Sequence, residues 1–362
     1  MLTFQPGIQP DHCIQAFVEA GAIRLAQPPA EGQIQPASLD LRLGEKAYRV
    51  RASFLPGPDR TVRRRLDELA LHEIDLTRGA VLETGCVYIA ELMEGLKLPA
   101  GLRAAANPKS STGRLDVFTR VITDRAREFD LVEDGYEGPL FIEISPRTFP
   151  VLVRSGSRLS QIRFRAGESR LDDRALGELH QSETLVTAAE PSFQGGVAVS
   201  VDLSGFGGLI GYRGKHHTAL IDVDRVGAYR ASEFWEPIPS DGSRALILDP
   251  GQFYILASKE AVHVPPDYAA EMTPFDALVG EFRVHYAGFF DPGFGHSGAG
   301  GQGARAVLEV RSRDVPFIIE DGQIVGRLVY EAMASRPAAL YGAGLKSNYQ
   351  GQALKLSKHF HD

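Results

Sequence analysis

A series of residues recurs in this chain at one constant offset, and this repeat is the feature that most constrains the fold. The second series lies 166 positions after the first, and the pairs are Leu82 and Leu248, Gly85 and Gly251, Tyr88 and Tyr254, Pro99 and Pro265, Ala104 and Ala270, Glu143 and Glu309, Pro150 and Pro316, Gly156 and Gly322. Such a gapless series predicts a tandem duplication of one unit. We expect a first domain over residues 1–190, including an N-terminal helical segment and the connection, and a second over residues 191–362, ending in a tail.

The composition favours a mainly β protein. At 362 residues the chain is long enough for two domains of ordinary size. Its 38 glycines and 22 prolines separate short apolar runs, which is typical of short strands joined by tight turns. The predicted fold is two tandem β-barrels or sandwiches with a few short helices.

Charge and cysteine content exclude several classes of protein. The net charge of −7 argues against a nucleic-acid binder, which would more often carry a basic field. Cys13 and Cys86 give neither metal-type spacing nor a disulfide framework, so we expect a reduced, cytoplasmic protein. The first ten residues lack a signal-peptide pattern and no apolar run reaches 18 residues, so no membrane association is expected.

The segment Lys109–Arg114 combines three hydroxyl groups with two cations. Hydroxyls donate to phosphate oxygens, and an arginine can hold them through paired hydrogen bonds. These residues therefore predict an anion site. The alternative is a solvated helix start with a serine as N-cap, which the local sequence favours when taken alone.

Glu143 and Glu309 each stand in an otherwise apolar strand, at the same position of the repeat. A partly desolvated glutamate can have a raised pKa and act as a general base for water. Strand alternation alone would allow both to face solvent, and a structural ion pair is the other alternative.

Two further segments contain candidate residues. Asp291 opens the turn Asp291–Gly295, which read by itself is a plain hairpin loop. The tail segment 346–352 could close over a ligand, although its composition alone indicates a surface segment. The pattern of a zinc deaminase, His-x-Glu followed by Pro-Cys-x-x-Cys, is missing from the sequence.

At this point the chain resembles a known family, the dCTP deaminases of the dUTPase-like superfamily, and in particular their longer, two-domain bacterial form. The residues that carry the resemblance are 36–44, 110–114, 140–144, 291–295, 308–310, 322–326 and 349–352. The resemblance implies a hydrolase that deaminates dCTP to dUTP, with dTTP as a candidate inhibitor. It also implies a homo-oligomer with sites between neighbouring barrels, Mg²⁺ accompanying the nucleotide, and no zinc.

The resemblance assigns roles to individual residues. Ser110, Ser111 and Arg114 would bind the triphosphate and help to place the water. Glu143 or Glu309 would be the base that prepares water for attack at cytosine C4. The other implied substrate-binding residues are Lys109, Asp291 (at the deoxyribose), Lys346, Tyr349 and Gln352.

Neither half matches the family pattern completely. The second half has residues 273–278 in place of the Ser-Ser-x-x-Arg segment, and the first half has Glu133 where an aspartate is expected. We therefore hypothesise a composite site, with the phosphate-binding residues from the first half and Asp291, Glu309 and the tail from the second. The competing hypothesis is a site built around Glu143 from first halves alone.

Two alternative functions stay open from the sequence. Residues 133–138 loosely resemble the dUTPase motif that carries a water-activating aspartate, so a dUTPase or a bifunctional enzyme that forms dUMP is the close alternative. The other is an inactive nucleotide-binding module, because degenerate copies often survive as binding domains.

Overall fold

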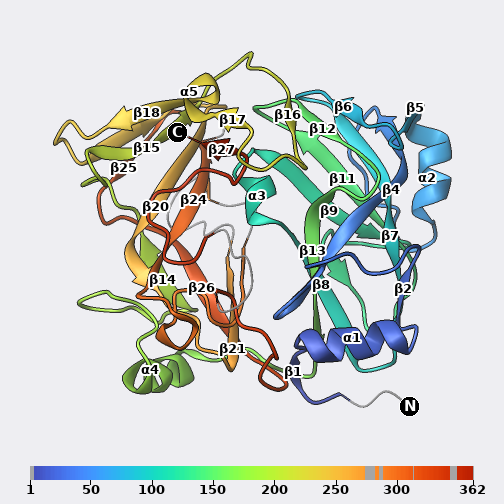
Figure 1. The fold of residues 1–362 in the computed structure, drawn as a ribbon, viewed down its shortest axis with the longest axis horizontal. Coiled ribbons are helices and arrows are strands. Elements are labelled where there is room, and N and C mark those ends of the chain that lie inside the picture. Colours follow the sequence, from blue (N-terminus) through green and yellow to red (C-terminus); the bar gives the residue numbers. More distant parts are fainter. Residues whose placement is uncertain (1–3, 274–281, 285–287, 313, 343–348, 362) are drawn as a thin grey trace.

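The structure, a computed structural model, describes residues 4–273, 282–284, 288–312, 314–342 and 349–361. Two strand-rich halves lie side by side, the first coloured blue to green and the second olive to red (Figure 1). The expected mainly β fold of barrel or sandwich type, with a few short helices, is confirmed. The helices are α1 (Asp11–Glu19), α2 (Val62–Leu69), α3 (Ser110–Gly113), α4 (Asp173–Ser182), α5 (Ala231–Phe234) and the 3-10 turn η1 (Ser297–Ala299).

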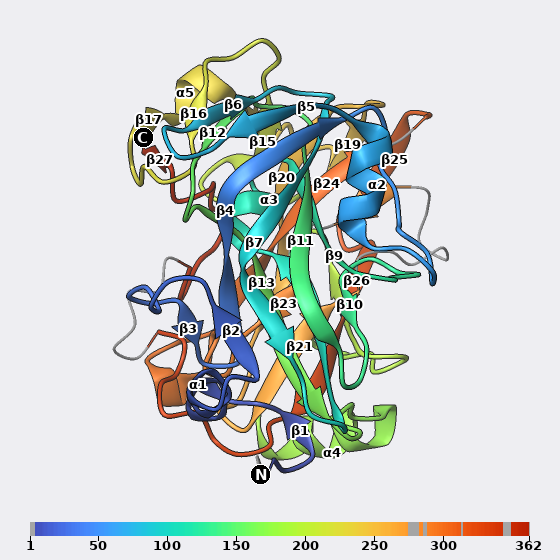
Figure 2. The same cartoon turned by 90° about the vertical axis from the view of Figure 1, so that its right-hand side faces the viewer.

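The strands of the first half form one large sheet and a small one. An 11-stranded sheet has the main order β10-β8-β13-β4-β7-β11-β9, and its long strands face the viewer in Figure 2. The strands are β1 (Gly7–Ile8), β2 (Ile23–Leu25), β3 (Ile34–Gln35), β4 (Ser38–Val50), β5 (Ala70–Asp75), β6 (Ala80–Leu82), β7 (Val87–Lys97), β8 (Leu102–Pro108), β9 (Val117–Thr123), β10 (Leu131–Val132), β11 (Glu137–Pro146), β12 (Val151–Val153) and β13 (Arg158–Ala166).

The second half divides its strands among smaller sheets, of which the largest has the order β18-β15-β20-β24-β22. Its strands are β14 (Val197–Ser200), β15 (Leu209–Gly214), β16 (Ile221–Asp222), β17 (Tyr229–Arg230), β18 (Trp235–Pro239), β19 (Ala245–Leu248), β20 (Phe253–Val262), β21 (Tyr268–Met272), β22 (Phe282–Val284), β23 (Phe289–Phe290), β24 (Ala304–Ser312), β25 (Phe317–Glu320), β26 (Ile324–Ala332) and β27 (Phe360–His361). The predicted domain boundary at residue 190 stays a prediction, and the connection contains α4, whose Leu176 packs into the core of the second half.

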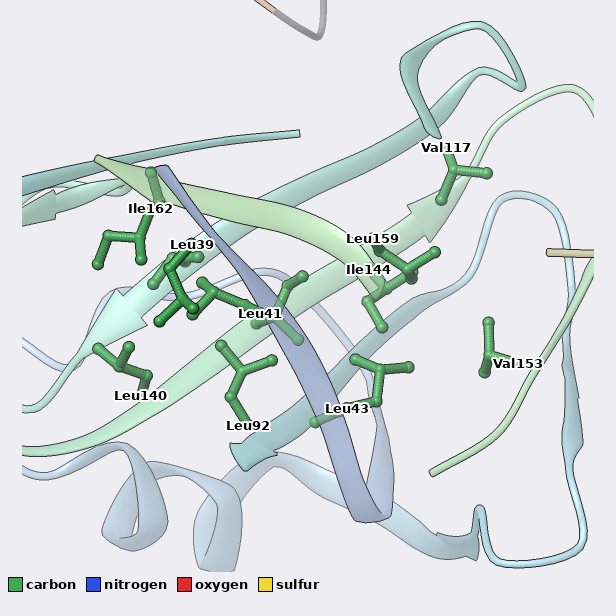
Figure 3. Packing of buried hydrophobic residues seen from close by; sticks show 14 of the residues in the cluster. Leu39, Leu41, Leu43, Leu92, Val117, Leu140, Ile144, Val153, Leu159 and Ile162 are labelled. Atoms are coloured by element: carbon green, nitrogen blue, oxygen red, sulfur yellow. The ribbon is translucent and has the colours of Figure 1, made fainter. Parts of the chain in front are cut away.

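Alternating leucines of β4 fill the core of the first half. Leu39, Leu41 and Leu43 are at most 1% exposed and pack between the strands (Figure 3). Burial of one such side chain contributes roughly 1.5–3 kcal/mol. The same core continues into the second half through Ile255 and Val307, so the seam between the halves is itself hydrophobic. This continuity fixes β20 and β24 against the first half.

The two halves share strand register as well as sequence. Glu143 on β11 lies opposite Ile89, and Glu309 on β24 lies opposite Ile255, which is the same pairing 166 positions later. Both halves also repeat one side-chain contact, because the backbone N–H groups of Glu83 and Asp249 donate to Tyr88 and Tyr254, respectively, each over 3.0 Å. The two glutamates therefore occupy equivalent positions in the sheets of their own halves.

The described part of the tail is docked and not a surface segment. β27 pairs in parallel with β17, and Phe360 packs against Phe234 and Trp235. Ser357 and His359 are each 2% exposed. The surface interpretation of segment 346–352 is wrong for Tyr349 and Gln352, which are 7% and 8% exposed.

Candidate active site

The short helix α3 lies between the two halves (Figure 1). It follows β8 through Lys109, whose extended backbone forms the N-cap, and the N–H groups of Thr112 and Gly113 donate to the Lys109 carbonyl over 2.8 and 3.0 Å. Ser111 and Thr112 are 7% and 3% exposed. The interpretation as a solvated helix start with a serine cap is therefore wrong, because Lys109 is the cap and the second half covers the helix.

Glu309 of the second half reaches the backbone of α3. A Cβ atom added at Gly113 would lie 2.3 Å from Glu309 Oε2 and 2.6 Å from its Oε1, closer than any side chain tolerates. Only glycine leaves room for this carboxylate. Glu309 is 2% exposed, so the solvent-facing interpretation of this strand position is wrong. The sequence repeat could not show it, because the covering helix belongs to the other half.

Glu143, the counterpart of Glu309, is held by an arginine of its own half. Arg120 on the neighbouring strand β9 donates from Nη2 to Glu143 Oε1 over 2.7 Å and from Nε over 3.2 Å. The guanidinium lies 3.5 Å from the centroid of the Phe129 ring and 4.8 Å from that of Phe118. Glu143 is 1% exposed, so it is not solvent-facing either. The structure therefore agrees with the alternative in which Glu143 forms a structural ion pair.

Arg114 joins α3 to the tail. Its Nη1 donates to the Lys355 carbonyl over 3.0 Å, and its Nη2 donates to Gln352 Oε1 over 2.9 Å. Its guanidinium lies 3.9 Å from the centroid of the Tyr349 ring. Gln352 also donates to the carbonyl of Arg305 on β24 over 3.0 Å, so the tail is bonded to both halves. Lys346 lies outside the described residues.

Lys109 and Asp291 each pair with an oppositely charged side chain of the first half. The Lys109 ammonium donates to Asp40, and Asp291 pairs with Arg163 over 3.1 Å. Burial raises the pKa of Asp291, while Arg163 and Lys109 both act to lower it.

Several residues at this seam were not found from the sequence. Asp40 lies in the segment 36–44 that carries the family resemblance, and this was the available signal. Gln350 Oε1 accepts from the Gly295 N–H over 3.1 Å. Burial raises the pKa of Tyr341, which Tyr349 raises further and Arg114 lowers. The patterns of alternation and spacing carry no signal for such contacts between distant segments.

An ion pair across the seam holds β24 in place two residues beyond Glu309. Arg311 bonds to Asp116, which follows α3, and donates to Thr148 Oγ1 over 2.9 Å. Thr148 donates in turn to Asp116 over 2.5 Å. Because Asp116 is completely buried, this network fixes the end of α3 relative to the strand that carries Glu309.

The donor groups around α3 suit an anion better than a metal held by the protein. Within the described ranges, no group of three or more His, Cys, Asp or Glu side chains is placed to hold a metal ion. Mg²⁺ usually binds through substrate phosphates with few protein ligands, which fits hydroxyl and cationic groups that bind the phosphates themselves. In the part of the chain that the structure describes, no helix has the length and apolar character needed to cross a bilayer.

A mainly β repeat fold, with a carboxylate buried against a Ser-Ser-x-x-Arg segment at the seam, defines an enzyme of the dUTPase-like class. The chain belongs to the dCTP deaminase family. Residues 5–168 match the family's "2'-deoxycytidine 5'-triphosphate deaminase (DCD) N-terminal domain", and residues 172–360 match its C-terminal domain.

Solved and curated relatives agree with this assignment. A crystal structure of 2'-deoxycytidine 5'-triphosphate deaminase from Agrobacterium tumefaciens is 63% identical, with a TM-score of 0.88 over 91% of this chain and 99% of that one. The dCTP deaminase of Haemophilus influenzae is 28% identical over 44% of this chain and 84% of its own length. A dUMP-forming dCTP deaminase from Parafrankia sp. is 33% identical over 42% of this chain and 72% of its own length.

Proposed function

We propose that this protein hydrolyses dCTP to dUTP and ammonia at a composite site, with Glu309 as the general base. The observation that carries the proposal is the approach of the Glu309 carboxylate to the Gly113 backbone in α3, beside Ser110 and Ser111. Glu143 is the weaker candidate because its Oε1 is held by Arg120 within the first half, whereas the Glu309 carboxylate lies against α3, which carries the hydroxyl groups. One chain thus supplies both halves of one site.

The reaction needs one base and a polarised ring. Glu309 takes a proton from water, and the resulting hydroxide attacks C4 of cytosine. The proton passes from Glu309 to N3 of the ring as the C4–O bond forms. Glu309 then takes the proton of the new C4 hydroxyl and delivers it to the 4-amino group, so that ammonia leaves as the C4–N bond breaks and the C4 carbonyl forms, with Glu309 returned to its starting state. A buried carboxylate suits this role. General base catalysis contributes roughly 10²–10⁴-fold to the reaction rate. In this proposal water is activated without zinc.

The substrate would be held by groups of both halves. Lys109, Ser110, Ser111 and Arg114 bind the triphosphate, and Arg114 and Ser110 also help to place the water. Mg²⁺ would accompany the phosphates and offset their charge. The remaining contacts fall to residues of the second half, namely Asp291 at the deoxyribose and Lys346, Tyr349 and Gln352 in the closing tail.

The shared register supports a tandem duplication in which one of two original sites was lost. The segment 273–278 lacks the hydroxyls and arginine of its counterpart, and Asp276 would repel a phosphate. We expect a homo-oligomer, as in the family the chain resembles, and inhibition by dTTP, which offers the same triphosphate to the site.

Formation of dUMP is the second candidate function. The relatives from Sulfurihydrogenibium sp. and Parafrankia sp. both carry the name "dCTP deaminase, dUMP-forming". Such an enzyme would also cleave the bond between the α- and β-phosphates and release diphosphate. A protein that binds nucleotides without turnover is the remaining alternative.

The test is to incubate the purified protein with dCTP and Mg²⁺, separate the nucleotides by chromatography and assay ammonia. Ammonia with dUTP supports the proposal, and ammonia with dUMP and diphosphate supports the second candidate. Diphosphate release from dUTP without ammonia would make the protein a dUTPase. Binding of dCTP without any product would leave the binding module and overturn the proposed reaction.

A further inference from the structure

Arg163 reaches from the first half of the chain into the second half. It lies on β13 and is 1% exposed. Its Nη1 donates to the Ala270 carbonyl on β21 over 3.2 Å, and its Nη2 donates to Asp291 Oδ1 over 3.1 Å and to the Phe290 carbonyl over 3.4 Å. The guanidinium lies 4.1 Å from the centroid of the Phe289 ring. All four partners belong to the second half.

The fold does not require an arginine at this position of the repeat. The residue 166 positions later is Val329. The strand pairing is the same in both halves, because Arg163 lies opposite Ala105 and Val329 lies opposite Glu271. Burial of a cation is costly unless its charge is paired, and Arg163 forms its ion pair with Asp291. This contrast points to the contact with Asp291, and not to sheet packing, as the role of Arg163.

A second residue of the first half holds the same segment beside α3. The N–H of Gly288 donates to Asn107 Oδ1 over 2.7 Å, and Asn107 lies opposite Gln161 where β8 pairs with β13. Asn107 precedes Ser110 by three residues, so at most about 11 Å of extended chain separates the two. The segment 288–291 is therefore bonded to the first half at both ends, next to the helix that carries the hydroxyl groups.

The turn that Asp291 opens is also bonded to the tail. Gln350 Nε2 donates to the Gly293 carbonyl over 3.2 Å. Two residues later in the tail, Gln352 accepts from Arg114 over 2.9 Å. The turn and the end of α3 are thus held by the same short segment of the tail.

One oxygen of the Asp291 carboxylate is left for a ligand. Arg163 holds Oδ1, whereas Oδ2 makes no hydrogen bond within the part of the chain that the structure describes. The Asp291 side chain is 11% exposed. Burial raises the pKa of Asp291, and the positive charge of Arg163 acts against this by favouring the ionised form. An ionised carboxylate is an acceptor only, so it suits a hydroxyl donor.

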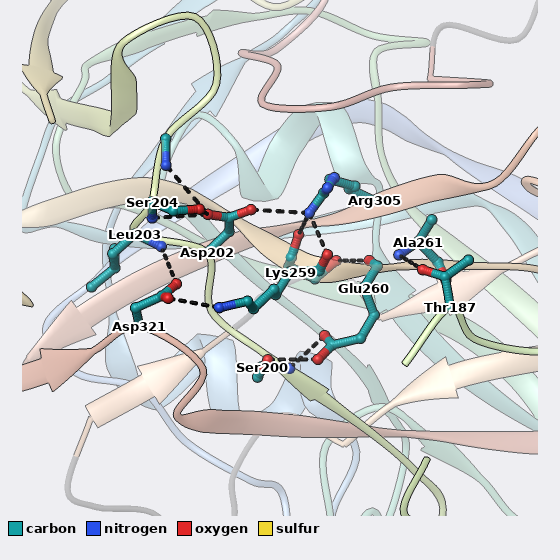
Figure 4. Close-up of polar contacts among 12 residues, drawn as sticks. Thr187, Ser200, Asp202, Leu203, Ser204, Lys259, Glu260, Ala261, Arg305 and Asp321 are labelled. Atoms are coloured by element: carbon teal, nitrogen blue, oxygen red, sulfur yellow. Dashed lines mark hydrogen bonds and ion pairs between the residues drawn. The ribbon is translucent and has the colours of Figure 1, made fainter. Parts of the chain in front are cut away.

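The second half contains an arginine of similar chemistry that stays within that half. Arg305 on β24 donates to Asp202 over 3.1 Å (Figure 4). It also donates to the Ser258 carbonyl over 2.8 Å. Both partners belong to the second half, so the Arg305 guanidinium stabilises one half instead of joining the two. Arg305 is therefore the matched structural arginine with which Arg163 can be compared.

We propose that Arg163 is a positioning residue, which orients the Asp291 carboxylate for the 3′-hydroxyl group of the nucleotide sugar. This inference rests on the proposed function, in which Asp291 contacts the deoxyribose. The 5′ oxygen of dCTP carries the phosphates and the 2′ carbon carries no oxygen, so the 3′-hydroxyl is the one sugar hydroxyl that can donate to a carboxylate. Arg163 was not found from the sequence, because Ala270 and Asp291 lie 107 and 128 positions away.

The test compares dCTP with its 2′,3′-dideoxy analogue, which lacks the 3′-hydroxyl, in steady-state assays of ammonia release with Mg²⁺. A hydrogen bond to a charged group is worth about 10–100-fold, so wild type should prefer dCTP by roughly that factor in kcat/KM. Arg163→Met should reduce this preference to near one, because the KM for dCTP rises while kcat/KM for the analogue stays close to wild type. Arg163→Lys keeps the charge and should restore part of the preference. A folded Arg163→Met variant with the wild-type preference would overturn the inference.

Further variants separate positioning from stability. Arg305→Met should lower the melting temperature but keep the wild-type preference for dCTP. Asp291→Ala should lose the preference as Arg163→Met does, and the double variant should lose no more, because both changes remove the same contact. An equal fall with both substrates in Arg163→Met, or the same loss of preference in Arg305→Met, would mean that Arg163 is merely structural and would sink the inference.

A variant closer in shape covers the case in which Arg163→Met does not fold. Arg163→Gln keeps a donor for the carbonyl groups of β21 and β23 but brings no charge to Asp291. It should lose the preference for dCTP over the dideoxy analogue. A wild-type preference in Arg163→Gln would overturn the inference in the same way.

The two proposals fail separately. If wild-type protein makes no ammonia from dCTP, calorimetry of the full chain with dCTP and the dideoxy analogue gives the same comparison. A binding preference that depends on Arg163 would then leave the inference standing, and the proposed reaction alone would be wrong. If ammonia is formed and the preference is the same in wild type and Arg163→Met, the inference is wrong and the reaction stands.

Discussion

The Glu309 carboxylate lies against the backbone of Gly113, although the two residues belong to opposite halves of the chain. The glycine is the reason the approach is possible, because any Cβ atom would overlap both carboxylate oxygens. The contact joins a strand that presents a carboxylate to a helix that presents hydroxyl groups. In the proposed composite site, each half of the chain therefore contributes one side.

Gly113→Ala should damage activity more than stability. The position is helical and tolerates a Cβ locally, but the methyl group would displace the Glu309 carboxylate by about 1 Å or more, which can cost about 100-fold in kcat. Gly177→Ala in α4 is the control, since its nearest neighbour would be 4.0 Å away. Ammonia release and thermal melting should be compared for both. Wild-type kcat in Gly113→Ala would contradict the placement of Glu309.

Glu309→Gln and Glu143→Gln should separate the two glutamates. If Glu309 is the base, its variant loses roughly 10²–10⁴-fold in kcat. The Glu143 variant keeps an acceptor for Arg120 and should retain turnover, with a stability loss of about 1–3 kcal/mol. The measurement is steady-state kinetics with dCTP. A reversed order of the two variants would place the site around Glu143.

Tyr349→Leu should weaken substrate binding through Arg114. The ring lies 3.9 Å from the guanidinium, and loss of a cation–π contact of this kind costs roughly 2–30-fold in KM. Tyr349→Phe keeps the ring and should have a KM close to wild type. Equal KM values for the Leu and Phe variants would show that the ring does not orient Arg114.

Asp130 should make stability depend on pH. Burial raises its folded-state pKa to about 7, with Glu143 and Glu271 raising and Arg120 lowering it. An unfolded aspartate titrates near about 3.9, so the unfolded state releases its proton first and the free energy of unfolding falls as pH rises from about 4 to 7. Asp130→Asn does not titrate and still accepts from Val121.

The melting temperature of Asp130→Asn should therefore exceed that of wild type by more at pH 8 than at pH 5. The difference in free energy reaches at most a few kcal/mol, on the order of the shift in pKa. The exposed Asp59 gives the matched control Asp59→Asn, which makes the same chemical change at the protein surface. A constant offset between Asp130→Asn and wild type at both pH values would contradict the expectation.

His359 should make docking of the tail sensitive to acid. Burial lowers its pKa to about 4, and the neutral ring bonds to Ser357 Oγ and the Val223 carbonyl, each over 2.9 Å. Lys358 also lowers this pKa, while Asp222 and Asp224 raise it. A released tail takes up a proton near pH 6.5, so docking is lost progressively as pH falls from about 6.5 to 4.

Limited proteolysis checks this, with His359→Gln as the variant that does not titrate. The rate of cleavage in the tail of the wild type, divided by the rate in the variant, should be higher at pH 5.5 than at pH 7.5. Taking this ratio cancels the pH dependence of the protease itself. A ratio that stays constant would mean that His359 does not control docking.

Much of the fold could be predicted from local patterns. The apolar strands expected around Glu143 and Glu309 are β11 and β24. Lys109, Ser110, Ser111 and Arg114 were found because hydroxyl and cationic groups stood close in the chain. The contact between Asp40 and Arg158 was missed because these residues are 118 positions apart in the chain.

The sequence by itself determined a mainly β chain with two matching halves and named both glutamates, since strand alternation and the repeat are local properties. It could not distinguish Glu143 from Glu309, because both have the same register in their own sheets. Only the tertiary structure distinguishes the two glutamates. Arg120 of the same half packs onto Glu143, whereas α3 of the other half covers Glu309. Packing across the seam, which no local pattern encodes, made equivalent residues different.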